Sequence, residues 1–269
     1  MRAARFAALA RSASVRRFFK LQVLLAALAG GCGPRLDVGS DVLWTGLFEG
    51  NTFDEWTGDS AGSAWAFPSP PGLTELTTER VRHGSYAAKL TVDAPAGSGQ
   101  TSAVLSRAGG SLPQAAYYSA WYYLPRTITV GTYWVIFKFR QQDASTMDEL
   151  YDLDLINLDT GEMSLQLYDH RRGGVVVPLD VASPVVPVGQ WFQIEAFYRN
   201  AQDDTGRVTY WLDGRQIVDV ANQPMAPTPW VEWNASSIAE DLTPSTAVIY
   251  VDDCAVSRTR VGPNGILAD

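Results

Sequence analysis

The chain has 269 residues with 21 basic and 29 acidic side chains, which gives a formal charge of −8 at neutral pH. This balance argues against nucleic acid as a partner and against a broad surface for polyanions, because both need clustered Lys and Arg. An anionic polymer would have to be met by a local basic groove.

The first 31 residues predict a cleaved signal peptide. Residues 1–20 hold six basic side chains and no acid, and an uncharged apolar run follows over Leu21–Ala29. A basic region, a short apolar run and small residues are typical of a secretory leader, and the run is too short to span a bilayer as a helix. Without the leader, 15 basic and 29 acidic residues remain, a charge of −14. The remaining length suits one all-β domain.

The end of this leader, Leu-Ala-Gly-Gly-Cys over Leu28–Cys32, resembles a bacterial lipobox. The resemblance implies that Cys32 is lipidated, and Gly33 is not the aspartate of inner-membrane retention. We therefore expect an outer-membrane lipoprotein anchored through its N-terminus, with a simple secreted protein as the alternative. Residues 32–41 would be a tether and residues 42–269 a single domain. Cys254 then has no disulfide partner and is expected to be a small buried residue.

Alternating apolar and polar residues predict β-strands along most of the chain after residue 42. In chain order these strands cover 100–107, 117–124, 132–140, 151–157, 164–170 and 247–256. The proline-containing segment 58–72 is predicted to be a loop. A weak helical signal over 235–242 leaves helix and loop both open.

Residues 190–220 predict three consecutive strands. Their apolar rows are Phe192 to Tyr198 at every second position, Val208 to Leu212 likewise, and Val218 with Val220. Asp213 and Gly214 form a two-residue hairpin signal, because a type I′ turn needs positive φ at both positions. Such a meander requires a second sheet against its apolar face.

Four motifs in the chain resemble the concanavalin A-like jelly rolls of bacteria, and in particular those of the heparinase and glucuronan-lyase type. They are Phe48-Glu49-Gly50 with Trp56, the turn and strand over 81–90, the meander over 190–220 and the closing strand over 250–253. The resemblance implies an all-β fold, a two-sheet antiparallel jelly-roll sandwich. It also implies that Glu49 and Asp252 share a structural calcium, since hard cations choose oxygen ligands; two solvated acids are the alternative. His83 is expected to be a turn residue.

Three strands carry polar and aromatic residues on the side opposite their apolar row. In the strand over 132–140 this side holds Trp134, Lys138 and Arg140. In a sandwich it would face outward. Aromatic rings stack on sugars, and Lys and Arg pair with uronate carboxylates. We therefore predict a glycan-binding groove formed by Trp134, Lys138, Arg140, Asp152, Asp154, Gln166, Tyr168 and His170.

Lyase chemistry on this scaffold is less well supported by the sequence. Lyases that the chain resembles carry Gln-x-His in a central strand, Arg in an early strand and Tyr in a late one. This chain has Lys138-Phe139-Arg140, residues 100–105 without Arg, and residues 230–234 without Tyr. A relocated site would use Tyr168 and His170 for proton transfer and Arg140 to clamp the carboxylate.

Hydrolase chemistries also fit the sequence poorly. Asp152, Asp154 and Glu149 only loosely match a glycosidase pair, and no nucleophile-elbow motif supports a serine hydrolase. The sequence therefore favours a surface lipoprotein that binds carbohydrate. A β-eliminating polysaccharide lyase is the first alternative, and a structural or protein-binding module of the cell surface is the second.

Overall fold

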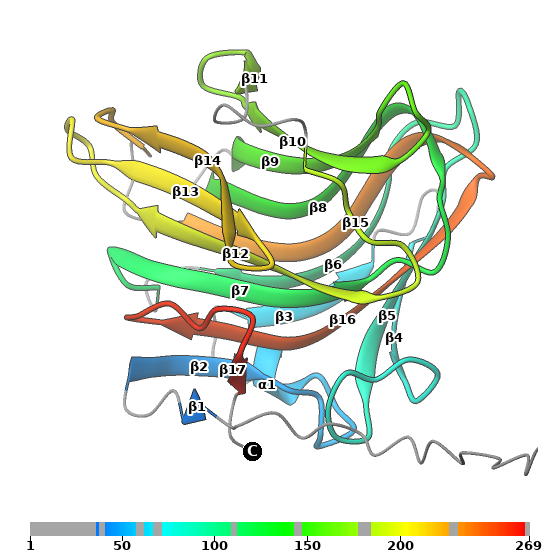
Figure 1. Ribbon diagram of the computed structural model, residues 1–269, viewed down its shortest axis with the longest axis horizontal. Coiled ribbons are helices and arrows are strands. Elements are labelled where there is room, and N and C mark those ends of the chain that lie inside the picture. The colour runs from blue at the N-terminus through cyan, green and yellow to red at the C-terminus, as the bar shows by residue number, and fades with distance from the viewer. Residues whose placement is uncertain are drawn as a thin grey trace, which may run out of the picture. The chain divides into compact units, whose positions relative to one another are not determined.

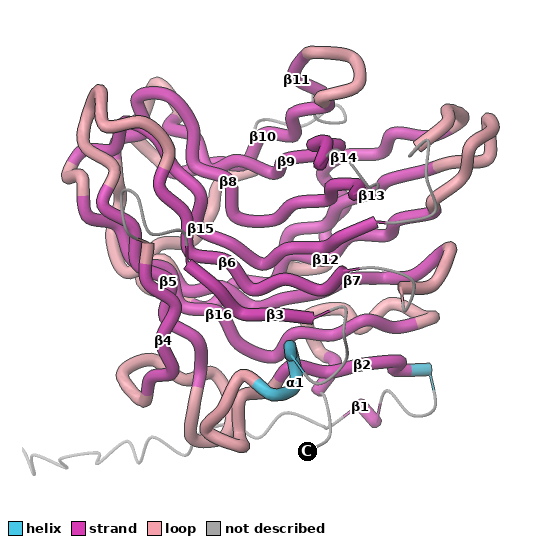
Figure 2. The backbone as a smooth tube through the Cα atoms, turned by 180° about the vertical axis from the view of Figure 1, so that it is seen from behind, coloured by secondary structure: helices cyan, strands magenta, loops and turns pink. Residues whose placement is uncertain are grey.

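Two antiparallel β-sheets, packed face to face, make up most of the described part of the protein (Figures 1 and 2). The structure is a computed structural model that describes residues 36–37, 41–57, 62–66, 72–108, 112–142, 147–176, 184–225 and 231–266. The predicted leader and Cys32 lie outside these residues, so the leader, the lipid anchor and the envelope location stay predictions. No helix among the described residues is long and apolar enough to cross a membrane.

The seven-stranded sheet is curled, as Figure 1 shows. In spatial order its strands are β11 (Gly174–Val176), β10 (Met163–Asp169), β9 (Met147–Asn157), β8 (Thr129–Gln142), β15 (Val231–Thr243), β6 (Thr101–Ala108) and β3 (Gly62–Ala66).

The second sheet has eight strands. In spatial order these are β14 (Arg215–Ala221), β13 (Arg207–Leu212), β12 (Trp191–Arg199), β7 (Ala115–Tyr123), β16 (Thr246–Ser257), β5 (Ala87–Asp93) and β4 (Leu73–Thr77), and β2 (Val42–Gly46) also pairs with β16. A one-turn helix, α1 (Asp54–Thr57), follows β2. Within the predicted tether, β1 (Leu36–Asp37) pairs in parallel with β17 (Gly265–Ile266). The predicted jelly-roll sandwich is confirmed.

Apolar residues at alternate positions of both sheets meet between the layers. Aromatic rings fill the centre of this core, where Phe139 stacks on Tyr198 with ring centroids 4.4 Å apart and Phe137 lies 5.6 Å from Trp233. Burial of such large side chains dominates the stability of the sandwich. Cys254 is a free buried cysteine, as predicted.

The meander over 190–220 has the predicted form. Strands β12 and β13 pair from Ile194–Leu212 to Arg199–Arg207, and Asp213 and Gly214 join β13 to β14 with φ values of 47° and 79°. Positive φ at both positions is what a type I′ hairpin requires.

Two strands lie where the sequence predicted a loop or a helix. Part of the predicted loop over 58–72 forms β3, which pairs with β6. The segment over 235–242, predicted as helix or loop, lies in β15, which pairs with both β6 and β8. Small residues such as Ala235, Ser236 and Ser237 give β15 no clear alternation, and a β-bulge after Ala235 shifts its phase. The helix interpretation was wrong.

Candidate functional site

A cleft of about 490 Å³ opens on the face of the seven-stranded sheet that turns away from the core. Strands β8, β9 and β10 supply most of its walls. Its lining residues are Gln100, Thr132, Tyr133, Val135, Lys138, Glu149, Asp152, Asp154, Gln166, Tyr168, His170, Val175 and Ile238. Six of the eight residues predicted for the groove therefore lie together.

Strand register sets the rows of this cleft. Lys138 lies opposite Asp152, and Asp152 lies opposite Tyr168 on the next strand. A second row runs from Val135 through Asp154 to Gln166. Directly opposed residues on one face of a sheet are close neighbours, so each row forms a short track of side chains across three strands.

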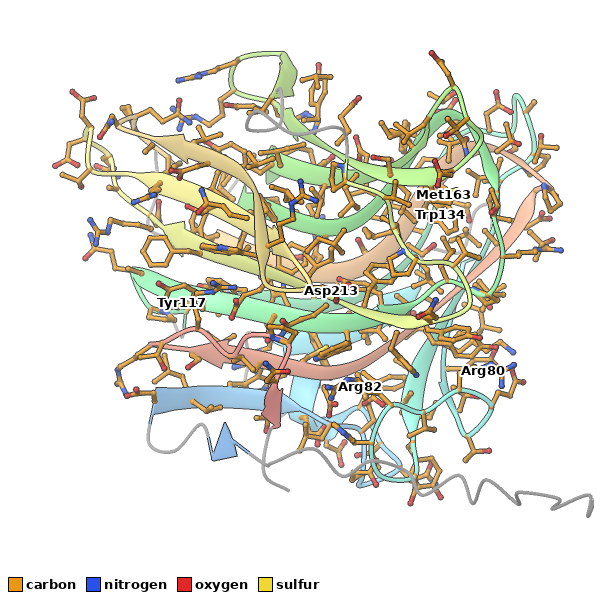
Figure 3. All side chains as sticks on the ribbon, viewed as in Figure 1. Arg80, Arg82, Tyr117, Trp134, Met163 and Asp213 are labelled. Atoms are coloured by element: carbon orange, nitrogen blue, oxygen red, sulfur yellow. The ribbon has the colours of Figure 1, made fainter. Side chains whose placement is uncertain are left out.

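Trp134 does not belong to this cleft. The side chain has no exposed area, packs in the core and donates from Nε1 to Ser237 Oγ at 2.9 Å (Figure 3). The reason is a bulge in β8 between Val135 and Phe137, where two positions of β8 pair with consecutive positions of β9. A bulge adds one residue and reverses the alternation beyond it.

The same bulge brings two residues into the cleft that the sequence pattern had assigned to the apolar side. Tyr133 and Val135 precede the bulge and line the cleft, whereas Phe137 and Phe139 follow it and lie in the core. Burial raises the pKa of Tyr133 to about 12, so its hydroxyl keeps its proton at neutral pH. A uniform period of two in this strand gave no signal for the reversal.

The cations of the cleft are paired with carboxylates. Lys138 Nζ lies 2.7 Å from Glu149 Oε2 and 3.7 Å from Asp152 Oδ1. His170 Nε2 forms a hydrogen bond of 2.8 Å with Asp152 Oδ2, and this bond raises the pKa of His170. The His170 ring also meets the Tyr168 ring edge to face, with centroids 4.8 Å apart. Tyr168, His170 and Asp152 thus form one connected group.

Asp154 has the most perturbed carboxyl group in the cleft. Burial, with the negative charge of Asp152 adding to it, raises the pKa of Asp154 to about 8. The side chain therefore carries a proton at neutral pH. Its Oδ1 is buried without a hydrogen-bond partner among the described residues, and Gln166 lies opposite it in the ladder. A protonated carboxyl group beside an amide can donate hydrogen bonds to a ligand oxygen.

Arg140 does not line the cleft. Its Nε and Nη2 donate to Glu232 Oε1 at 2.8 and 2.5 Å, and Asn234 Nδ2 donates to the same oxygen at 2.7 Å. Both members of the ion pair are buried, with 7% of Arg140 and 3% of Glu232 exposed. The proposed carboxylate clamp is therefore not supported, because a carboxylate of the protein itself already occupies this guanidinium.

Glu49 and Asp252, the predicted calcium ligands, hold the same turn by accepting backbone N–H groups. Glu49 accepts from Ser85 and Tyr86, and Asp252 Oδ2 accepts from Arg82 at 2.8 Å. Within the described residues no group of three or more His, Cys, Asp or Glu side chains is placed to hold a metal ion. The calcium assignment stays a prediction. His83 lies in this turn, as expected, with Nδ1 2.6 Å from Asp253 Oδ2.

Comparison with known proteins supports the fold. No family model and no curated protein sequence matches the chain. Among solved structures, an endo-β-1,4-glucuronan lyase of the fungus Trichoderma reesei is similar, with a TM-score of 0.57 and 15% identity over 75% of this chain and 94% of that one. The fold is that of the jelly-roll lyases.

Two further solved structures agree with this assignment. A marine alginate lyase of Aplysia kurodai has a TM-score of 0.53 at 10% identity, covering 81% of this chain and 99% of that one. An alginate lyase of a Chlorella virus has a TM-score of 0.51 at 10% identity, covering 81% and 100%. Structural similarity at identities this low establishes the jelly-roll scaffold alone. The chemistry of the cleft must therefore be argued from its own residues.

Proposed function

We propose that the protein binds a polysaccharide chain in the cleft of its seven-stranded sheet. The observation that carries this proposal is the composition of the cleft: the aromatic side chains Tyr133 and Tyr168 beside hydrogen-bonding groups such as Gln166, in a space of about 490 Å³. A ligand site commonly combines apolar surface with a few placed polar groups in a volume of this order. The lyase-like scaffold supports a glycan as the ligand.

The charge balance of the cleft suits recognition of hydroxyl groups. Lys138 is already paired with Glu149, and Asp152 is paired with His170. These groups can donate to and accept from sugar hydroxyls without leaving a buried charge unpaired. Tyr168, which is half-buried, offers ring surface for stacking.

Tyr168→Ala should weaken glycan binding at least about tenfold, or ~1.4 kcal/mol, because truncation of an aromatic anchor removes both stacking area and a hydroxyl. Isothermal titration with the best ligand from a glycan array measures the change. Tyr123→Ala, which removes a half-buried tyrosine of β7 on the other sheet, is the matched control and should bind as the wild type does. Equal binding by Tyr168→Ala, or binding to a protein partner and to no glycan, would refute the proposal.

A β-eliminating lyase is the second candidate, and the protonated Asp154 favours it. Elimination from a uronate requires a neutralised carboxylate, removal of the C5 proton, formation of the C4=C5 bond, breakage of the C4–O4 bond and a proton for the leaving oxygen. Asp154 and Gln166 would donate hydrogen bonds to the carboxylate. Tyr168 and His170, in ring contact, would carry the two proton transfers.

Tyr168→Phe separates the two candidates, since it keeps the ring and removes the hydroxyl. If the cleft is catalytic, wild type incubated with glucuronan or alginate should release unsaturated uronate, read by its absorbance. Tyr168→Phe should then lose most of this activity, by about a hundredfold or more for a lost acid–base group, while it keeps its affinity. Absence of unsaturated product from the wild type with every uronate polymer tested would leave the binding function alone.

A further inference from the structure

A second pocket lies on the outer face of the eight-stranded sheet and shares no lining residue with the cleft described above. It has a volume of about 220 Å³ and is lined by Tyr117, Phe197, Arg199, Arg207, Thr209 and Trp211. Their neighbours along the same strands, such as Tyr118, Ala196 and Tyr210, pack in the core. The pocket therefore opens to solvent on the opposite side of the sandwich from the cleft, with Tyr117 near one end of β7 (Figure 3).

Two aromatic rings form the floor of this pocket. Tyr117 lies directly opposite Phe197, and Phe197 lies opposite Thr209 on the next strand. The two ring centroids are 5.0 Å apart, and both side chains are half-buried, so each offers part of its ring to solvent. Trp211 also lines the pocket. Only 9% of it is exposed, and the Arg260 guanidinium lies 4.4 Å from its ring. Exposed ring surface beside hydroxyls is suited to a sugar.

Two arginines at the rim face each other across strands. Arg199 lies directly opposite Arg207, and like charges in this position destabilise a sheet. Asp219 neutralises Arg207, with oxygens 2.8 and 2.7 Å from Nε and Nη2. Arg199 is exposed, lies 5.9 Å from the Phe197 ring, and has no carboxylate within salt-bridge distance among the described residues. The rim therefore carries an excess positive charge on an acidic chain.

We propose that this pocket is a second glycan site, which takes an acidic sugar. The sugar ring would lie on Phe197 and Tyr117, and its carboxylate would pair with the guanidinium of Arg199. A planar guanidinium matches a carboxylate in two parallel hydrogen bonds, which an ammonium group cannot do. The cleft differs, because its cations are already paired with carboxylates. The exposed guanidinium of Arg199 therefore favours an acidic ligand, and the two aromatic rings favour a sugar.

The pocket does not depend on the proposed cleft function. Because the two sites face opposite sides of the sandwich, one polymer chain would engage them on different protein molecules. Polysaccharide with acidic residues would then be cross-linked, and binding to long chains would gain avidity that short oligomers lack.

The experiment uses Tyr168→Ala as background, so that cleft binding is reduced and the second site is observed. Titration with a glucuronate oligosaccharide is compared with titration of its carboxyl-reduced, neutral counterpart. We expect the acidic form to bind and the neutral form to bind about tenfold more weakly or worse. Added salt should weaken binding of the acidic form, since an exposed ion pair is screened.

Arg199→Gln in the same background should lose binding of the acidic oligosaccharide by about tenfold or more. Arg215→Gln, at an exposed arginine of the same sheet outside the pocket, is the matched control and should bind as the background does. Unchanged affinity in Arg199→Gln, or equal affinity for the neutral oligosaccharide, would overturn the second site. Neither outcome bears on the cleft, which is tested by Tyr168→Ala against the wild type.

Discussion

Asp154→Asn should make the protein more stable at pH 8 by about 5 kcal/mol and remove part of the loss of stability between pH 4 and pH 8. The carboxyl group of an unfolded chain ionises near pH 4, whereas burial keeps the proton on Asp154 until about pH 8. Between these values the folded state binds more protons than the unfolded state. The free energy of unfolding therefore falls as pH rises, by up to about 1.4 kcal/mol per pH unit, and stops falling above pH 8.

Urea unfolding of wild type and variant at several pH values measures this effect. Burial also raises the pKa of Asp252, to about 7, so Asp252 contributes a slope of the same sign to both proteins and cancels in their difference. Asp159→Asn, an identical change in an exposed turn, should follow the wild-type profile. A difference between Asp154→Asn and wild type that does not change with pH would show that Asp154 is ionised in the folded protein.

Arg140→Met should lower the free energy of unfolding by about 3–5 kcal/mol, the second large effect expected in this protein. The change leaves Glu232 buried with a hydrogen bond from Asn234 but without its cation. Urea unfolding near pH 7 gives the loss. Adding Glu232→Gln should recover much of it, because a neutral amide is far less costly to bury than an unpaired carboxylate.

An exposed pair provides the control for this prediction. Arg207→Met breaks a contact with Asp219 in which 47% of the arginine side chain is exposed, so about 1 kcal/mol or less is expected. Folded Arg140→Met should also bind glycan like the wild type, because Arg140 does not line the cleft. Loss of glycan binding with unchanged stability would instead restore Arg140 as a ligand-binding residue.

The fold could be predicted where the two faces of a strand differ in chemistry. The core face of β12 and β13 is apolar, whereas the other face carries polar side chains such as Gln193, Glu195 and Thr209, so their sequence alternates and ends at a recognisable hairpin. Strand β15 could not be predicted, because Ala235 and Ala239 face the core and Ser236 is buried as well. Periodicity disappears when small residues are buried on both faces.

Most of the cleft could be predicted from the sequence, but the pairing of its charges could not. Alternation along β9 and β10 is enough to put Asp152, Asp154, Tyr168 and His170 on one face. The position of Arg140 relative to Glu232, 92 residues away, depends on which strands become neighbours in the sheet. Three facts that decide the chemistry, namely the paired arginine, the protonated Asp154 and the buried Trp134, follow from tertiary contacts that no local pattern records.

The β-bulge between Val135 and Phe137 in β8 also affects how the sequence of such a protein can change. It divides one long strand into two segments whose inward and outward sides are set separately. Substitutions at Tyr133 or Val135 can change the shape of one end of the cavity, while Lys138 keeps its place at the other. Deleting Ile136 would remove the extra residue and give the strand one regular alternation, with Trp134 still facing the core and Tyr133, Val135 and Lys138 still facing the cavity. The extra residue can therefore be lost or gained while the side chains that line the cavity stay the same.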